Sequence, residues 1–102
     1  MTPADAVFAA LADPTRRHLI ESLASEPASA TRLAADLPIS RQAVAKHLAG
    51  LRAASLVSVE RVGRESRYSL DPAPLGDAAE WIARVGGEWD ERLSKLRRTL
   101  DA

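Results

Sequence analysis

The chain has 102 residues, of which 46% are hydrophobic and 4% aromatic, and it contains no cysteine. This length predicts one domain with a core of aliphatic side chains, and the absence of thiols excludes disulfides and cysteine-based metal or redox sites. Fourteen basic residues balance fourteen acidic ones, so the whole chain is neutral. We expect a cytoplasmic protein, because no segment approaches the roughly 18 apolar residues that cross a bilayer and the N-terminus lacks the basic region of a signal peptide.

The first third of the chain carries the starts of three helices. Thr2 and Asp13 each stand directly before a proline, which is typical of a helix cap followed by proline at the first helical position. The pattern predicts one helix from Thr2 and a second from Asp13 to about Ser25, both with an apolar face. Ser29 is placed to cap a third helix over residues 30–37, which the following proline ends.

The stretch SRQAVAKHLAGL predicts a fourth helix over residues 40–54, capped by Ser40. A helical wheel places Val44, Leu48 and Leu51 within about 60° of one another, as an inward stripe. The third and fourth helices are short and a tight turn separates them, which is the arrangement of a helix-turn-helix. The opposite face carries Gln42, Ala45, Lys46, Ala49 and Ala53, flanked by Arg41 and Arg52.

The outward face of this helix has the chemistry of a surface that reads DNA. The amide of Gln42 can donate and accept hydrogen bonds, as an adenine edge requires, and Lys46 can reach guanine edges or phosphates. A small side chain such as Ala45 lets the backbone approach a groove wall, and the helix N-terminus at Ser40 offers N–H groups to a phosphate. His47 lies at the edge of the inward stripe, where packing or a phosphate contact fits better than base reading. The alternative interpretation is a solvated face with a few charges.

A basic hairpin is expected to follow this helix. Residues 57–70 alternate in polarity around Gly63, which predicts two strands joined by a turn. The segment 40–68 holds six basic and two acidic residues, whereas the segments on either side of it are net negative. Chance produces such excesses, but on a helix-turn-helix followed by a hairpin this one indicates a winged-helix surface for a polyanion. The six basic residues are Arg41, Lys46, Arg52, Arg61, Arg64 and Arg67.

The last predicted helix covers residues 75–100 and is suited to pairing with another helix. Gly86 and Gly87 either interrupt it or let a partner helix approach closely. Trp81 and Trp89 are expected as dimer or core anchors, with an inducer pocket between subunits as the alternative. The apolar positions recur in steps of three and four and are Leu75, Ala79, Ile82, Gly86, Trp89, Leu93, Leu96 and Leu100.

Three stretches carry a family resemblance: ALADPTRRHLIESL (10–23), ATRLAADLPISRQAVAKHLAGLRAASLV (30–57) and GRESRYSLDP (63–72). They resemble bacterial winged helix-turn-helix regulators of the ArsR type, over about residues 4–74. The expected fold is mainly α with a small β-hairpin, in the order α-α-α-α-β-β-α, as a single domain over 1–102. The resemblance implies a homodimeric repressor in the bacterial cytoplasm, associated with the nucleoid, that reads a pseudo-palindromic operator with its recognition helices about one DNA turn apart.

The resemblance also implies which segments bind DNA and which form the dimer. The recognition helix would be 40–54, the wing 57–70, and the first helix and the helix at 75–100 would form the dimer. Many family members sense metals through cysteines on the third helix or through aspartate and histidine on the last one. The tail, with Trp81, Trp89 and ERLSKL (91–96), is similar to a metal-independent branch of the family. Because the chain has no cysteine and its last helix has no histidine, we expect no metal or cofactor. The family often has serine at the position of Ala45, and this difference leaves the operator sequence open.

The candidate functional residues fall into two groups. The residues expected to contact DNA are Ser40, Arg41, Gln42, Ala45, Lys46, His47, Arg52, Arg61, Arg64 and Arg67. The residues expected in the dimer interface are Val7, Phe8, Leu11, Ile82, Trp89, Leu93 and Leu96. The expected partners are double-stranded DNA, a second copy of the chain and, as a further hypothesis, a small-molecule inducer.

Two other classes of function fit the sequence less well. His18 and His47 have no carboxylate or serine partner at a motif spacing, and a Gly-rich phosphate loop is absent, so an enzyme is not expected. A winged-helix module that binds another protein and not DNA remains the alternative, because the overall charge is neutral.

Overall fold

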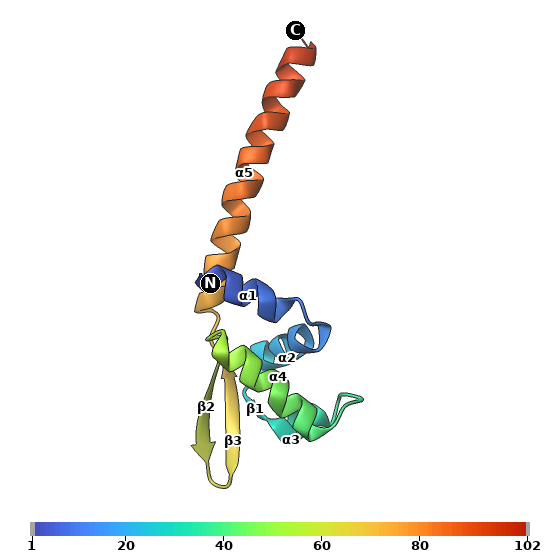
Figure 1. Ribbon diagram of the computed structural model, residues 1–102, viewed down its shortest axis with the longest axis vertical. Coiled ribbons are helices and arrows are strands. Elements are labelled where there is room, and N and C mark those ends of the chain that lie inside the picture. The colour runs from blue at the N-terminus through green and yellow to red at the C-terminus, as the bar shows by residue number, and fades with distance from the viewer. Residues whose placement is uncertain (1, 102) are drawn as a thin grey trace.

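The computed structural model describes residues 2–101, and Met1 and Ala102 of the expected domain lie outside this range. The mainly helical fold with a small hairpin is confirmed, with one strand added to the expected order (Figure 1). The elements are α1 (Pro3–Leu11), α2 (Pro14–Ser25), β1 (Ala28–Ser29), α3 (Ala30–Ala34), α4 (Arg41–Ala53), β2 (Val57–Val62), β3 (Glu65–Leu70) and α5 (Ala73–Asp101).

The four predicted helix caps are all formed. Thr2 and Asp5 make a reciprocal capping box on α1, in which each side chain accepts a hydrogen bond from the backbone N–H of the other. Asp13 Oδ1 accepts from the N–H groups of Thr15 and Arg16 at 2.8 and 3.1 Å. The N–H of Arg16 chiefly, and that of Thr15, hold the pKa of the Asp13 carboxyl below its ordinary value of 3.8. The two remaining caps are Ser29 on α3 and Ser40 on α4.

Helix α3 is shorter than predicted. We expected it to reach residue 37, but it ends at Ala34. After Ala34, the N–H groups of Asp36 and Leu37 bond to carbonyls three residues back, which is tighter than an α-helical turn. The physical reason is Pro38, because the residue before a proline, here Leu37, is disfavoured in the α conformation.

The sheet has three antiparallel strands in the order β1-β3-β2. In the hairpin, Val62 pairs with Glu65, which leaves a two-residue turn in which Gly63 has a φ of 63°. A positive φ at the first turn position is what tight hairpins require, and glycine adopts it without strain. The strand missed from the sequence is β1, which has two residues and pairs Ala28 with Tyr68. A segment this short carries no alternation that could predict it.

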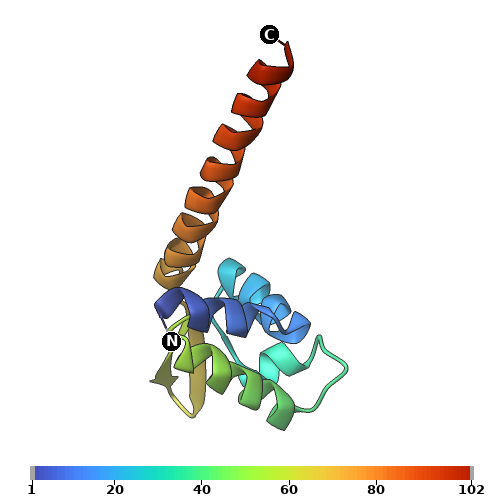
Figure 2. The same ribbon diagram turned by 45° about the horizontal axis from the view of Figure 1, so that its top comes forward.

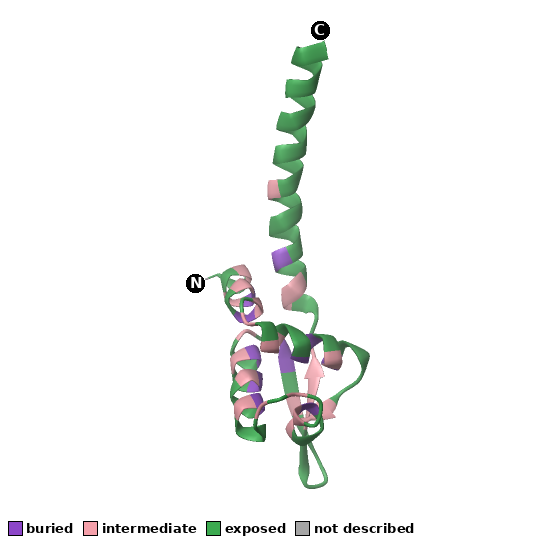
Figure 3. Cartoon of the chain, turned by 90° about the vertical axis from the view of Figure 1, so that its right-hand side faces the viewer, coloured by how far each residue is buried: buried purple, intermediate pink, exposed green. Residues whose placement is uncertain are grey.

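The core is aliphatic and lies where the helices and the sheet meet (Figure 3). Val44, Leu48 and Leu51 are each 0% exposed, so the predicted inward stripe of α4 is confirmed. Val7 is also 0% exposed. The prediction that Val7 belongs to a dimer interface is therefore wrong, because its side chain is fully covered by its own protomer.

Helix α5 leaves the body and projects away from it (Figures 1 and 2). It starts two residues earlier than predicted, with Asp71 Oδ1 accepting from the N–H of Ala73 at 3.1 Å. It continues without interruption through Gly86 and Gly87, which excludes a break at that point. Ala78 is its one buried residue in the part of the chain that the structure describes. The rest of α5 therefore contributes little to the core of its own protomer.

Candidate nucleic-acid interface

Helix α4 divides its side chains as a recognition helix requires. Its buried stripe fixes it against the core, and Arg41, Gln42, Ala45 and Lys46 on its other side are all exposed. The Ser40 hydroxyl accepts a hydrogen bond from the N–H of Ala43 at 3.1 Å and so holds the start of the helix. The exposed face combines an amide, two cations and a small side chain, which suits the edges and phosphates of a DNA groove.

A groove of about 510 Å³ lies between the start of α4 and the hairpin. Arg41, Gln42 and Ala45 line it from α4, and Arg61 and Arg64 line it from the hairpin. Figure 1 shows the hairpin tip and the start of α4 at the end of the molecule opposite to the C-terminus of α5. Five of the predicted DNA-binding residues are thus brought together from two separate segments.

The cations of this groove are not neutralised by neighbouring acids. Within residues 2–101, Arg41, Arg61 and Arg64 form no ion pair; Arg61 Nε donates only to the Gly63 carbonyl, at 3.4 Å. Glu65 also lines the groove, without pairing to them. Unpaired guanidinium groups on an exposed surface are available to phosphate oxygens.

Arg67 is not brought together with these residues. The hairpin register pairs Arg61 with Ser66 and Glu60 with Arg67. Because successive side chains alternate between the faces of a strand, Arg67 lies on the face opposite to Arg61. It lines a different groove, together with Glu26 and Arg32. Arg52 and Lys46 are exposed on α4 but lie outside both grooves.

His47 connects α4 to α2. Its Nδ1 accepts a hydrogen bond from Arg16 Nε at 3.4 Å and lies 4.0 Å from Asp13 Oδ2. A neutral His47 that accepts at Nδ1 carries its proton on Nε2. The predicted boundary position of His47 therefore has a specific partner, and base reading has no support from its placement.

Arg16 is a residue that we missed from the sequence. Its guanidinium crosses α4 directly over Gly50, where an added Cβ would lie 2.6 Å from Arg16 Cζ. The one sequence pattern that relates to this contact is the spacing of His47 and Gly50, which are three residues apart and so share one face of the helix. A glycine at this point lets Arg16 of α2 hold α4 in place.

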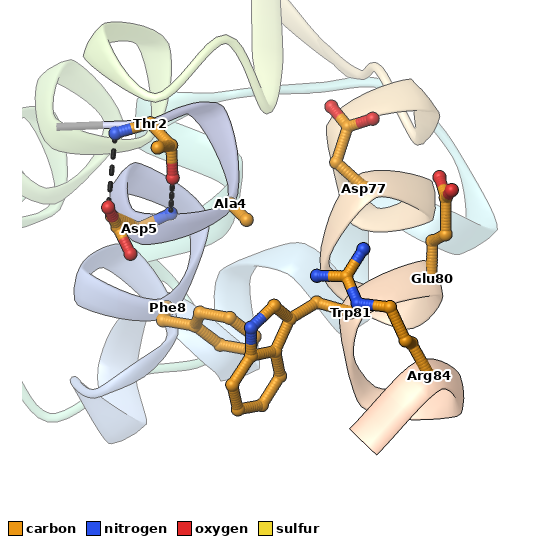
Figure 4. Close-up of a pocket in the computed structure, with 8 residues that line it drawn as sticks. All are labelled: Thr2, Ala4, Asp5, Phe8, Asp77, Glu80, Trp81 and Arg84. Carbon is orange, nitrogen blue, oxygen red and sulfur yellow. Dashed lines mark hydrogen bonds between the residues drawn. The ribbon is translucent and has the colours of Figure 1, made fainter. Parts of the chain in front are cut away.

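A second cavity, of about 690 Å³, lies between α1 and α5, away from the groove (Figure 4). Phe8 and Trp81 meet there edge to face, with ring centroids 5.4 Å apart. Asp77, Glu80 and Arg84 line it from α5. Trp81 therefore anchors α5 to α1, and the predicted dimer residue Phe8 is in part covered by its own chain.

Two further observations concern metal binding and membrane-spanning helices. Within residues 2–101, no three histidine, aspartate or glutamate side chains lie close enough together to hold a metal ion. No helix over the same range combines the length and the apolar character needed to cross a membrane.

Similarity to known proteins agrees with this geometry. A family model described as a helix-turn-helix domain matches residues 11–60. The chain is 46% identical to the HTH-type transcriptional regulator Rv2034 of Mycobacterium tuberculosis, over 96% of this chain and 89% of that protein. It is 32% identical to the transcriptional repressor SdpR of Bacillus subtilis, over 85% of this chain and 97% of that protein. The solved structure of an ArsR-like transcriptional regulator from Rhodococcus sp. RHA1 matches with a TM-score of 0.81 at 44% identity, covering 95% of this chain and 92% of that one.

Proposed function

The chain belongs to the ArsR-type winged helix-turn-helix regulators, which are DNA-binding transcriptional regulators, and from this membership we propose that it is a homodimeric repressor of a pseudo-palindromic operator. The observation that carries the proposal is the groove between α4 and the hairpin, where Arg41, Gln42, Arg61 and Arg64 converge without ion pairs.

Each part of this surface has a separate role in the proposal. Helix α4 enters the major groove, where Gln42 and Lys46 contact base edges and the small Ala45 lets the helix approach closely. Arg61 and Arg64 of the hairpin contact phosphates beside it. His47 and Arg52 act at the border of the surface, on the backbone of the DNA. Base choice thus depends on α4, and overall affinity depends on the cations.

The homodimer follows from the symmetry of a palindrome. Two copies of α4 related by a two-fold axis read two half-sites spaced by whole turns of DNA. The proposed interface uses α1 and α5, through Phe8, Leu11 and the exposed apolar side chains of α5. These are Ile82, Trp89, Leu93 and Leu96, each about half exposed in the protomer.

The salt dependence of binding to the DNA upstream of its own gene tests this proposal. If Arg41, Arg61 and Arg64 each neutralise one phosphate in both protomers, six contacts give a slope of log K against log salt of about −5. Arg64→Ala removes two contacts and makes the slope shallower by about 2. The matched control is Arg67→Ala on the same hairpin, which we expect to leave the slope unchanged because Arg67 lines the other groove.

Base reading by α4 is tested separately. Gln42→Ala should change the sequences selected from a random DNA pool while leaving the salt slope nearly intact. Absence of binding at low salt would favour the protein-interaction module, and unchanged affinity in the Arg41→Ala, Lys46→Ala double variant would show that α4 is not the reading helix.

Regulation by an organic inducer and not by a metal completes the proposal. The chain has no cysteine, and α5 has no histidine, so α5 offers neither the thiolate nor the imidazole ligands that soft and borderline metals prefer. The cavity beside Trp81 is the proposed inducer site. A compound that quenches Trp81 fluorescence in a Trp89→Phe variant and also releases DNA would support this role, and release of DNA by zinc alone would contradict it.

A further inference from the structure

Three side chains connect α2 to α4 at the border of the exposed face of α4. His47 Nδ1 accepts a hydrogen bond from Arg16 Nε at 3.4 Å and lies 4.0 Å from Asp13 Oδ2. Asp13 caps α2 through Oδ1, and its Oδ2 accepts no hydrogen bond within residues 2–101. The imidazole of His47 therefore lies between a permanent cation and a carboxylate oxygen that can still accept.

We propose that Arg16 is a further DNA-contact residue and that a proton on His47 controls its release. While His47 is neutral, Arg16 stays bound to it over Gly50. Once His47 is protonated, the ring pairs with Asp13 and the Arg16 guanidinium turns to a DNA phosphate. The inference rests on the proposed DNA surface of α4, to which it adds one contact residue and one regulatory input, the pH.

The hydrogen bond between Arg16 and His47 exists only while the imidazole is neutral. Nδ1 accepts through its lone pair, and a protonated imidazole has an N–H group at both nitrogens and no acceptor. The guanidinium keeps its charge throughout, so protonation replaces the hydrogen bond by repulsion between two cations. Histidine is the side chain that changes charge between about pH 5 and 8, and this range therefore contains the change.

Asp13 is the group that receives the protonated ring. A small rotation brings the new N–H of His47 to Oδ2, where it makes a charge-assisted hydrogen bond. The N–H of Arg16 chiefly holds the pKa of the Asp13 carboxyl below 3.8, so this acceptor stays ionised across the whole range. The other elements packed on α4 place their cations elsewhere, because Arg32 of α3 and Arg61 of β2 line the two grooves near the hairpin, and His47 lines neither.

Arg16 lies where a released guanidinium can reach DNA bound to α4. It crosses α4 over Gly50, where an added Cβ would lie 2.6 Å from its Cζ. On a helical wheel Gly50 is about 40° from the exposed Lys46 and about 140° from Ala45, which lines the groove beside the hairpin. The exposed face of α4 thus has the hairpin cations on one side and Arg16 on the other. Arg16 is therefore placed to contact the DNA strand opposite to the one beside the hairpin.

The charge of the two states sets the direction of the pH effect. The protonated state carries one more positive charge in each protomer and leaves Arg16 free. A polyanion binds this state more tightly and so shifts the population toward it, which means that affinity rises as the pH falls. One freed Arg16 in each protomer of the dimer makes the slope of log K against log salt steeper by about 2.

The affinity for the DNA upstream of its own gene at pH 8 and at pH 5.5 tests the pH effect. We expect the natural chain to bind at least about tenfold more tightly at pH 5.5, because two phosphate contacts are added. His47→Gln keeps an amide oxygen that can accept from Arg16 but takes up no proton, so its affinities at the two pH values should be nearly equal. The matched control is His18→Gln, which removes the other histidine of the chain, exposed on α2, and should keep the natural pH profile.

The contact made by Arg16 is tested by comparing its loss at the two pH values. Relative to the natural chain, Arg16→Ala should lose at least about tenfold more affinity at pH 5.5 than at pH 8, and its salt slope should no longer change with pH. Arg16→Lys keeps a cation that binds phosphate, so it should retain part of the gain at low pH. A residue that only supported the fold would weaken binding equally at both pH values, and circular dichroism confirms that every variant is folded.

The release of Arg16 can be observed without DNA. In nuclear magnetic resonance spectra, a cross-peak between the δ protons of Arg16 and the α protons of Gly50 should be present at pH 8 and lost at pH 5.5. In His47→Gln the same cross-peak should persist at both pH values.

The outcomes separate this inference from the proposed function. Equal affinity of the natural chain at both pH values, a pH profile that survives in His47→Gln, or an Arg16–Gly50 cross-peak that persists at pH 5.5 overturns the inference while DNA binding stands. Absence of DNA binding at either pH overturns the proposed function and the DNA contact of Arg16 together. A gain at low pH that is lost in His47→Gln and in Arg16→Ala but kept in His18→Gln supports the inference.

Discussion

Replacing Gly50 by alanine tests how α2 holds α4, the proposed recognition helix. The added Cβ would lie 2.6 Å from both Cζ and Nη2 of Arg16, which is too close for either to remain. The guanidinium is the end of a flexible side chain, so it will move and not the helix. Its departure breaks the 3.4 Å hydrogen bond from Arg16 Nε to His47 Nδ1.

Two opposing contributions set the size of the effect. Alanine stabilises a helix interior by about 1 kcal/mol relative to glycine. Loss of the hydrogen bond costs about 1 kcal/mol, below the usual range for a charged donor such as the Arg16 guanidinium because the bond is long. We therefore expect Gly50→Ala to change the free energy of unfolding by less than about 0.5 kcal/mol. In an Arg16→Ala background the same change should stabilise by the full amount, about 1 kcal/mol, or about 4 to 8 °C in Tm.

Urea unfolding of the natural chain, the two single variants and the double variant measures the coupling. Far-ultraviolet circular dichroism should follow all four at one protomer concentration, because the stability of a dimer depends on concentration. Gly87→Ala serves as a control, since nothing lies near Gly87 and its gain should not depend on Arg16. Equal stabilisation by Gly50→Ala with and without Arg16 would refute the contact across α4.

Two further predictions concern local structure and pH. Helix α4 ends in a turn in which Ser55 has a φ of 60° and the N–H of Leu56 bonds to the Leu51 carbonyl at 3.0 Å. Ser55→Gly should relieve this backbone strain and raise the free energy of unfolding by about 0.5 to 1 kcal/mol, which is measured as a higher urea midpoint. A lowered midpoint would contradict this prediction. The folded-state pKa of Asp13 lies below 3.8, so its carboxylate contributes stability above that pH, and the contribution is lost as the pH falls through the folded value. Asp13→Asn keeps a capping oxygen but does not titrate, so unfolding measured from about pH 5 down to about pH 2.5 should show a smaller loss of stability in the variant; an equal loss would show that other carboxylates are responsible.

Short-range patterns were sufficient to predict most of the elements. Each helix cap lies within three residues of the N–H groups that it accepts, as Ser40 does with Ala43, so the sequence determines it directly. The periodicity of α4 likewise separated Val44 and Leu48 from Gln42, because one helix face must enter the core. The class of fold and the location of the positive charge followed from the order of these local signals.

Contacts between distant segments were decided by tertiary structure alone. Strand β1 exists because Ala28 meets Tyr68, forty residues later, and its own two residues carry no pattern. The placement of Arg67 away from Arg61 depends on the hairpin register, since a shift of one residue would reverse the face of every side chain. The contact of Arg16 with Gly50 joins residues that are 34 apart in the sequence. Val7 does not belong to the predicted dimer interface, because the core of its own protomer covers it fully. Sequence by itself thus determined which faces are apolar or charged, because those depend on neighbours within one or two turns; the folded chain decided which faces meet, because that depends on the packing of all elements at once.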